Sequence, residues 1–392
     1  MAEFGPVTCA GCALLCDDVL VSDVNGGARL RPECPRGATW FSERVHRAGG
    51  PAAAVMGQPV DVDGALTRAA ELLRGARRPL LHGFDGATVE DARAAVALAD
   101  RLGALVATRG IEGPWPGAPA VPLRGASTAT LGEIRDRSRL VVIWREDPER
   151  THPRLLERLG FGSPSEERVL VVVDDRETAT AGRADVRLHW PRERDLEALV
   201  ALHVLQRGLD VGATSLAEIH ERLSAVPHAA LVYGPGLTAG PGGQRRALAL
   251  NELVRDLSHD RHVVTLELPR DPGTRGADDV LAWQSGYSGN VDFAGGHPEL
   301  VTATQPLDAF DLRLLVESRP EGEAEGASEI AIGCLPPQAE AEVWIRTAAA
   351  GIAAGGTAHR LDGVPLALQA PRPDDAPTAA AVLTWLLEAV HR

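Results

Sequence analysis

Short runs of consecutive apolar residues alternate along most of this chain with longer amphipathic stretches. The apolar runs have the length and continuous hydrophobicity of strands that are covered on both faces, and they lie at residues 79–83, 104–108, 140–144, 168–174 and 229–234. Helical periodicity marks the stretches at 65–74, 88–102, 130–136, 196–207, 215–223 and 243–257. Strands that alternate with helices in this way predict parallel sheets joined by crossover connections.

Two regions depart from this regular pattern. Residues 109–126 hold four prolines and four glycines, so we expect them to be irregular. The final third shows strands at 263–268 and 312–316, a stretch of small residues at 348–357 and a last helix at 378–390.

The first fifty residues predict a small separate module. A strand at 18–24, the turn signal Asn25-Gly26-Gly27 and a returning strand at 28–31 indicate a β-hairpin. Cys9, Cys12 and Cys16 precede this hairpin and Cys34 follows it. The hairpin therefore gives the fourth thiol a reason to lie near the first three.

Four thiols in the pattern C-x2-C-x3-C, with the fourth after 17 intervening residues, can converge on one centre. Ligation by thiolates alone suits a [4Fe-4S] cluster or a structural zinc ion, because both favour soft sulfur. Pro35 follows Cys34, as proline often follows the last cysteine of iron–sulfur motifs. We expect Cys9, Cys12, Cys16 and Cys34 to hold a [4Fe-4S] cluster; zinc and an empty, vestigial site are the alternatives. A disulfide framework is disfavoured in a long chain with five cysteines, an odd number.

Composition narrows the function classes. The 392 residues include 40 basic and 54 acidic side chains, a formal net charge of −14 that argues against nucleic acid as a partner. Every basic residue is arginine, so Schiff-base and P-loop chemistry that requires lysine is excluded. No basic segment precedes an unbroken apolar run near the start, and no stretch is long enough to cross a membrane. We expect a cytoplasmic protein without a membrane partner.

Several motifs, in the same order, resemble the B subunit of formylmethanofuran dehydrogenase, a family of the molybdopterin oxidoreductases. The cysteine motif with Asp17-Asp18 is one of them, and W-Q-S-G-Y at 283–287 with V-D-F at 291–293 is another. The remaining matching segments lie at 130–134, 141–144, 151–154, 296–298, 351–352 and 356–365.

The resemblance implies an α/β fold with a small N-terminal Cys-rich module and two Rossmann-like parallel-sheet lobes. The module should cover 1–50, one lobe 51–125 plus 262–392, and the second lobe 126–261. In this family the N-terminal cysteines hold a [4Fe-4S] cluster beside a molybdenum or tungsten bis-pterin centre. The metal also takes a cysteine or selenocysteine that follows the second strand of the first α/β block.

Two departures from the family pattern indicate that the metal centre is lost. The region 107–115, where the metal-ligating cysteine should stand, contains no cysteine and keeps only Gly113-Pro114 of its motif. After the strand at 140–144, a Gly-x-Asn-Pro loop for the cofactor's nucleotide should follow. Arg145-Glu146-Asp147-Pro148 stands there instead, and we expect the first two side chains to fill the groove that glycine keeps open. No Mo/W-bis-pterin is therefore expected.

This pattern resembles the B subunit of the bacterial formyltransferase/hydrolase complex, a dehydrogenase-derived chain without the redox centre. The resemblance implies a structural role in the oxidation of formaldehyde to formate, with partner subunits of A, C and D type. It also implies a furan-type carrier with a polyglutamate tail, linked to a tetrahydromethanopterin-type carrier. An active molybdopterin-dependent subunit of formylmethanofuran or formate dehydrogenase and an iron–sulfur electron-transfer module are the alternatives.

Other candidate residues carry two interpretations each. His152 and His297 are candidates for substrate contacts, or they cap loops and anchor subunit contacts. Arg360 and Asp362 could bind an anionic carrier or form an internal ion pair. Asp17-Asp18 either tunes the cluster or starts the hairpin. The glycines at 234–236 and 240–243 could cradle a phosphate at a helix N-terminus, and Cys334, in an apolar run, is expected to be a core thiol.

Overall fold

The computed structural model describes residues 3–24, 27–45, 51–109, 120–162, 168–212, 214–303, 305–318, 328–337 and 341–391. The chain divides into two compact units, Met1–Pro114 with Asp271–Arg392, and Trp115–Arg270. Among the described residues, no helix is long and apolar enough to cross a membrane.

The first unit begins with the predicted module. Its strands β1 (Glu3–Val7), β2 (Val19–Val24) and β3 (Gly27–Arg31) form an antiparallel sheet in that order, and α1 (Pro35–Val45) follows. The β2–β3 pairing confirms the hairpin, although Asn25 and Gly26 of its turn lie outside the described residues. The module packs through Ala10 and Leu15 on a second hairpin, β18 (Gly356–His359) and β19 (Pro365–Leu368).

A nine-stranded sheet forms the centre of the first unit, in the order β14-β13-β7-β6-β15-β16-β17-β4-β5. The five central strands, β7 to β17 in this order, are parallel, and the two strands at each edge are antiparallel. The bounds are β4 Ala53–Val55, β5 Gln58–Val60, β6 Pro79–Gly83, β7 Leu105–Ala107, β13 Asn290–Asp292, β14 Glu299–Leu300, β15 Leu312–Val316, β16 Ser328–Gly333 and β17 Val343–Arg346.

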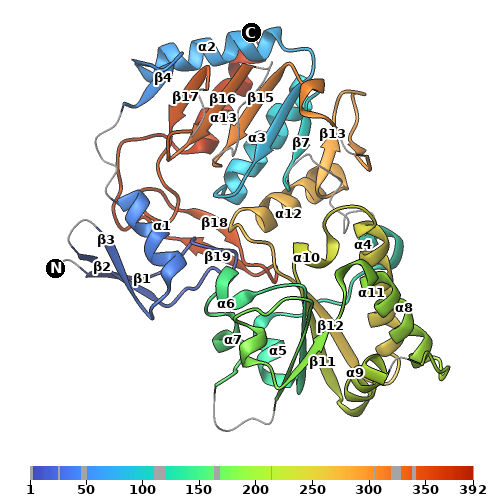
Figure 1. Cartoon of the computed structure of the whole chain (residues 1–392). Coiled ribbons are helices and arrows are strands. Elements are labelled where there is room, and N and C mark those ends of the chain that lie inside the picture. Colours follow the sequence, from blue (N-terminus) through green and yellow to red (C-terminus); the bar gives the residue numbers. More distant parts are fainter. Residues whose placement is uncertain are drawn as a thin grey trace. The chain divides into compact units, whose positions relative to one another are not determined.

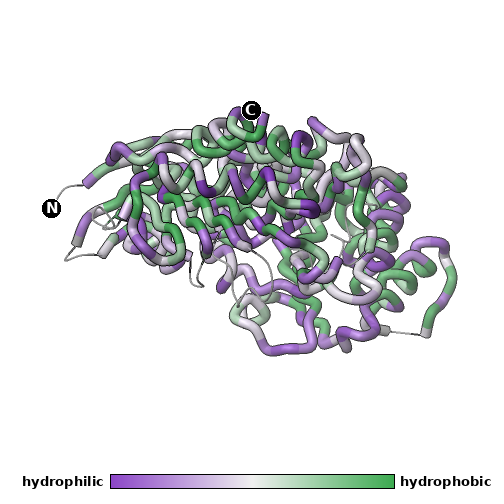
Figure 2. The backbone as a smooth tube through the Cα atoms, turned by 90° about the horizontal axis from the view of Figure 1, so that it is seen from above, coloured by the Kyte–Doolittle hydropathy of each residue, from purple (hydrophilic) through white to green (hydrophobic). Residues whose placement is uncertain are grey.

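Four helices pack on this sheet: α2 (Val62–Gly75), α3 (Val89–Leu102), α12 (Thr274–Ser285) and α13 (Ala379–His391) (Figure 1). Their buried side chains share one apolar cluster with alternate residues of the central strands, among them Leu81, Leu314 and Ile330. The start of α3 is fixed by its sequence, because Thr88 and Asp91 form a reciprocal capping box. Figure 2 shows how hydrophobic and hydrophilic segments alternate along the chain.

The second unit contains a five-stranded, fully parallel sheet in the order β10-β9-β8-β11-β12. Its strands are β8 Leu140–Trp144, β9 Val169–Asp174, β10 Val186–His189, β11 His228–Tyr233 and β12 His262–Glu267. Its helices are α4 Ala120–Arg124, α5 Leu131–Arg137, α6 Pro148–Thr151, α7 Leu155–Arg158, α8 Asp195–Gln206, α9 Thr214–Ala225, α10 Pro235–Thr238 and α11 Gly243–Leu257. Every residue of β8 is buried, as expected for a strand that is covered on both faces.

The predicted helices and strands of the regular part are confirmed, each within a few residues. Two expectations were wrong. The Pro/Gly-rich stretch 109–126 contains the helix α4, which contacts α11. Ala120 of α4 is buried, and Arg124 pairs with Glu252 of α11 at 2.6 Å. The final third is also more regular than its pattern suggested, since α12 and several strands of two to six residues were missed.

The first unit breaks off at Pro114 and resumes at Asp271, whereas the sequence suggested boundaries at 125 and 262. The N-terminal module also falls within the first unit. The finer division into a module at 1–50 and two lobes stays a prediction.

Candidate functional site

The loop between β1 and β2 carries three of the four cysteines. Hydrogen bonds from Cys9 N to Cys16 O, 2.8 Å, and from Leu15 N to Cys12 O, 3.2 Å, close this loop on itself. Cys34 directly precedes α1, and its carbonyl accepts the first helical hydrogen bond, from Ala38 N at 2.9 Å. Cys9, Cys12 and Cys16 are buried, and Cys34 is half-buried.

Two glycines allow α1 to approach the cysteine loop. A Cβ atom on Gly11 would lie 3.0 Å from the Cα atom of Gly37. A Cβ atom on Gly37 would lie 3.0 Å from the sulfur of Cys9 and 2.6 Å from a methyl group of Leu30. The close contact of these two backbones brings Cys34 beside the Cys9 loop, as the hairpin argument predicted.

The environment of the thiols is unfavourable for isolated thiolates. Burial raises the pKa of Cys9 well above its usual range, and the backbone N–H of Gly11, 3.4 Å from the Cys9 sulfur, opposes this shift. Burial also raises the pKa of Cys12 to about 12, partly opposed by the N–H of Leu14 and the charge of Arg36. The charges of the other thiolates add to the rise for both groups, so the thiols lie close enough to repel one another when ionised.

Four thiolates gathered in this way need a compensating positive charge, which a bound iron–sulfur cluster would supply. The shielding of three sulfurs and the N–H groups directed at them suit the thiolate ligands of a cluster. In the described part of the chain, no three His, Cys, Asp or Glu side chains are grouped closely enough to hold a single metal ion. The ligands of a four-iron cluster stand farther apart than those of one ion, so the cluster stays a prediction.

The end of β7, where the resemblance places the metal-ligating cysteine, is occupied by an ionic contact. Thr108 follows β7 and donates a hydrogen bond of 2.5 Å to Asp278 of α12. Arg109 forms an ion pair of 2.6 Å with the other carboxylate oxygen of Asp278. Thr108 and Asp278 are buried. Residues 110–115 of this region lie outside the described residues.

The second unit has a strand order that normally creates a ligand site. β9 lies on one side of β8 and β11 on the other, so the chain reverses direction across the sheet between β8 and β11. In open α/β sheets, ligands bind beyond the carboxyl ends of the strands at such a switch point. A nucleotide groove in this unit would therefore lie between the loops that follow β8 and β11.

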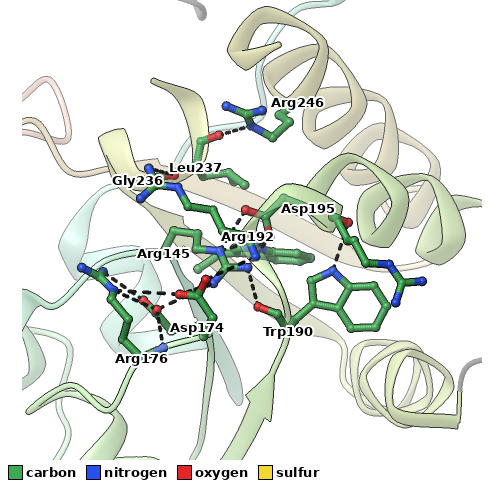
Figure 3. A network of polar contacts seen from close by, with 12 residues as sticks. Arg145, Asp174, Arg176, Trp190, Arg192, Asp195, Gly236, Leu237 and Arg246 are labelled. Carbon is green, nitrogen blue, oxygen red and sulfur yellow. Dashed lines mark hydrogen bonds and ion pairs between the residues drawn. The ribbon is translucent and has the colours of Figure 1, made fainter. Parts of the chain in front are cut away.

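Arg145 fills that place with its own side chain. It is 2% exposed and binds Asp195 through Nε, at 2.9 Å, and through a second nitrogen at 2.9 Å (Figure 3). The same guanidinium donates a hydrogen bond of 2.6 Å to Trp190 O and pairs with Asp175 at 3.1 Å. Asp195 also accepts a hydrogen bond of 3.0 Å from the indole of Trp144.

The backbone of Arg145 keeps the conformation that favours glycine. Its φ angle is 56°, in the left-handed region, which costs a residue with a side chain roughly 1 kcal/mol. The resemblance places a glycine at this position. The chain thus retains the shape of a glycine loop but places a buried cation in the space that glycine would leave open.

The glycine-rich loop after β11 packs against the same residues. A Cβ atom on Gly234 would lie 1.9 Å from a carboxylate oxygen of Glu146, and one on Gly236 would lie 2.1 Å from the carbonyl oxygen of Arg145. Arg192 and Arg246 hold this loop through hydrogen bonds to Gly236 O, 2.9 Å, and Leu237 O, 2.6 Å (Figure 3). The loop after β8 occupies the space beside Gly234 and Gly236, which disfavours a phosphate cradle at these two glycines. The cradle at 240–243 stays a prediction.

The two histidines have different environments. His152 is fully buried, and its ring nitrogens lie 3.0 Å from the Thr151 hydroxyl and 2.9 Å from Pro269 O, so it joins two loops of the second unit. His297 is exposed and lies 2.9 Å from Glu299 and 3.1 Å from Gly295 O, within a turn of the first unit.

The remaining candidates favour structural roles. Arg360 and Asp362 form the internal ion pair, at 2.7 Å. Asp17 and Asp18 are exposed in a bend directly before β2, which agrees with the start of the hairpin. Cys334 was expected in the core, but it lies half-buried just beyond the end of β16.

Sequence reasoning missed the acidic partners of the two arginines. Asp195 begins α8 and Asp278 lies within α12. Acidic residues are common in helices, so the sequence gives no reason to single out these two. Sequence reasoning also missed Glu317, which follows β15 with a φ of 46°. Burial raises the pKa of Glu317 to about 7, against hydrogen bonds from Thr347 Oγ1 and Cys334 N.

No family model matches the chain. The B subunit of the tungsten-containing formylmethanofuran dehydrogenase 2 of Methanocaldococcus jannaschii is 28% identical over 93% of this chain and 92% of its own length. The equivalent protein of Methanococcus maripaludis is 26% identical over 94% of both chains. The B subunit of the formyltransferase/hydrolase complex Fhc of Methylorubrum extorquens is 28% identical over 63% of this chain and 68% of its own length.

Comparison with solved structures agrees with these sequence relatives. A chain in the crystal structure of the Methylorubrum extorquens formyltransferase/hydrolase complex FhcABCD, in complex with methylofuran, has a TM-score of 0.72 and 28% identity. The match covers 87% of this chain and 99% of that one. Acetylene hydratase from Pelobacter acetylenicus, at a TM-score of 0.55 and 12% identity over 98% of this chain and 69% of its own, shows the fold alone. The chain shares its fold with these two solved structures, and it is a homologue of the B subunits of formylmethanofuran dehydrogenase and of the formyltransferase/hydrolase complex.

Proposed function

We propose that this chain is the B subunit of a formyltransferase/hydrolase complex in one-carbon metabolism and that it serves there as a non-redox structural component. The observation that carries the proposal is the buried Arg145–Asp195 pair at the switch point of the second unit. A nucleotide-bearing pterin cannot enter that groove while two interlocked loops and a buried guanidinium occupy it. The missing cysteine at 107–115 removes the metal ligand as well.

Partners and carrier follow from the relatives. The solved complex that contains a similar chain is FhcABCD, in complex with methylofuran. We therefore expect A-, C- and D-type subunits to accompany this chain, and a furan-type carrier with a polyglutamate tail to pass between the catalytic partners. The chain itself is then not catalytic.

The test is metal analysis of the complex after anaerobic purification from its native host. The proposal predicts partner subunits in the preparation and no molybdenum or tungsten. Close to one equivalent of either metal per chain would overturn it. Formate oxidation coupled to a viologen dye, above the background of a partner-free control, would favour the active dehydrogenase instead.

The cysteine site favours one additional feature. We infer that Cys9, Cys12, Cys16 and Cys34 hold a [4Fe-4S] cluster, which supplies one-electron transfer when bound and also fastens the N-terminal module. The four sulfurs should lie roughly 6–7 Å apart around the cluster. Because the bis-pterin centre is expected to be missing, the fastening role has the stronger support.

The fifth cysteine offers a matched control. Cys12→Ser should remove the brown absorbance and most of the iron, whereas Cys334→Ser, at a half-buried site outside the motif, should leave both unchanged. Colourless wild-type protein with zinc or with no metal, purified anaerobically, would show a zinc-loaded or vestigial site.

A further inference from the structure

A cavity of about 1040 Å³ opens at the edge of the five-stranded sheet where its strands begin. Arg139, Arg168 and Asp185 each directly precede a strand, β8, β9 and β10 respectively. These three strands are neighbours and parallel, so the three side chains gather at one edge. Arg222, in the last turn of α9, lines the same cavity.

The three arginine side chains differ in how firmly neighbouring groups fix them. Arg139 is exposed, and no hydrogen bond or ion pair of its guanidinium is found among the described residues. Arg168 is fixed by hydrogen bonds to the carbonyl oxygens of Ser138, Leu159 and Arg135. Arg222 pairs along its own helix with Glu218, at 2.8 Å, where both side chains are solvent-accessible.

The one acidic residue of the lining is already engaged. Asp185 accepts a hydrogen bond of 2.8 Å from the backbone N–H of Leu170. The rest of the lining is aliphatic: Val169, Val186, Ala225, Val226 and Pro227. The cavity thus combines three guanidinium groups with an apolar wall, on a protein whose net charge is −14.

We propose that this cavity binds a small organic polyanion that carries two or more carboxylate or phosphate groups. Arginine presents a planar fork that suits both kinds of oxyanion, and Arg139 and Arg222 supply it here. The three guanidinium nitrogens of Arg168 already donate to backbone carbonyls, so Arg168 contributes positive charge to the cavity. The aliphatic wall would cover the carbon skeleton of such a ligand. The site lies at the amino ends of the strands, the opposite edge from the loop that Arg145 fills.

Isothermal titration calorimetry on the full chain, with any subunits that accompany it, tests the proposal. Citrate and inorganic pyrophosphate serve as the probes, at low ionic strength. The variant Arg139→Gln/Arg222→Gln should weaken binding by about tenfold or more, since it removes two charge-assisted contacts. Arg245→Gln, which removes an exposed arginine of α11 that does not line the cavity, should bind as the wild type does.

Each result decides the question. Saturable binding of citrate alone assigns carboxylates, of pyrophosphate alone assigns phosphates, and of both assigns a site selective for charge. Absence of binding of both probes up to about 10 mM would overturn the proposal. Equal loss in the Arg245→Gln control would overturn it too, because attraction by net charge alone would then explain the binding. Should the double variant fold poorly by circular dichroism, the single variant Arg139→Gln, at an exposed position, replaces it under the same criteria.

Discussion

A single side chain, Arg145, decides what the switch point of the second unit can do. Its charge is removed from water and balanced by Asp195 and Asp175 in the same unit. Around it, Asp174 is held ionised: burial would raise its pKa, but hydrogen bonds from Arg176 keep the pKa below the usual range. Removal of one partner from a buried ion pair of this kind is strongly destabilising, because the charge that remains is neither paired nor solvated.

Arg145→Gly is therefore expected to destabilise the protein even though it restores the glycine that the backbone conformation suits. Loss of the buried partner of Asp195 costs about 3–5 kcal/mol, and relief of the left-handed strain returns roughly 1 kcal/mol. Urea denaturation measures the difference. Arg187→Gln, at an exposed arginine of β10 whose partner Glu177 is exposed as well, should cost less than about 1 kcal/mol. A glycine variant as stable as the wild type would contradict a stabilising role of the Arg145–Asp195 pair.

Glu317 is expected to make the stability of the first unit depend on pH. Its carboxyl group faces Thr347 and the N–H of Cys334, with the charges of Asp91 and Arg44 near enough to act on it. Burial raises its pKa from 4.5 to about 7. The folded protein then binds this proton more tightly than the unfolded chain does. Its contribution to stability is complete below pH 4.5 and is lost as the pH rises through 7.

Glu317→Gln should remove that dependence. The variant is expected to match the wild type near pH 5 and to be more stable near pH 8, by at most about 3 kcal/mol. Urea denaturation across this range measures it, and Glu71→Gln, on the exposed face of α2, serves as the control with no change in slope. Asp85 titrates in the same direction, with its pKa raised by burial to about 6, so some dependence remains in the variant. A wild-type stability that rises from pH 5 to 8 while the variant's does not would contradict the assignment.

At the scale of elements, the contact between α1 and the cysteine loop brings Cys34 beside the other three cysteines of the proposed cluster site. The backbones of Gly11 and Gly37 lie in direct contact, and the sulfur of Cys9 lies against Gly37. The apolar cluster that holds the N-terminal module against β18 and β19 is small, with Ala10 and Leu15 as its buried members from the module. The stability of the module should therefore depend on the proposed iron–sulfur cluster as much as on packing.

Gly37→Ala is expected to reduce both the iron content and the melting temperature. The new methyl group would meet Leu30 and the Cys9 sulfur closer than van der Waals contact allows, so α1 and Cys34 must shift. Iron and acid-labile sulfide per chain are the measurements, with melting curves beside them. Gly75→Ala, at the end of α2 with nothing within 4 Å of the added atom, should be neutral or slightly stabilising. Full iron content in Gly37→Ala would show that cluster binding does not depend on the contact between Gly11 and Gly37.

At the scale of the whole molecule, the two units have separate apolar cores. One core joins the nine-stranded sheet to α2, α3, α12 and α13, and the other joins the five-stranded sheet to α8, α9 and α11. Arg145 belongs to the second unit, whereas Gly37 and Glu317 belong to the first.

Hydrogen exchange should show this separation. Arg145→Gly is expected to raise exchange in β8, β9 and β11 and to leave β15 and β16 near the wild-type rates, because each strand is protected by its own core. Gly37→Ala should do the reverse, with faster exchange in the N-terminal module and unchanged exchange in the five-stranded sheet. Equal acceleration in both sheets for either variant would contradict independent cores. Mass spectrometry of peptic peptides from the two units provides the measurement.

The sequence by itself determined the elements that local pattern controls. Continuous apolar runs such as 140–144 and capped amphipathic helices such as α3 carry their own signals. The motif spacing indicated the Cys9–Cys34 set, and the resemblance to the dehydrogenase family indicated the filled loop at Arg145. What only the tertiary structure decided are contacts between distant segments. Asp195 and Asp278 look like ordinary helix residues until the fold sets them against Arg145 and Arg109, and short strands such as β13 and β14 exist because neighbouring strands pair with them. Charge balance and strand pairing depend on which segments meet in space, and no periodicity along the chain records that.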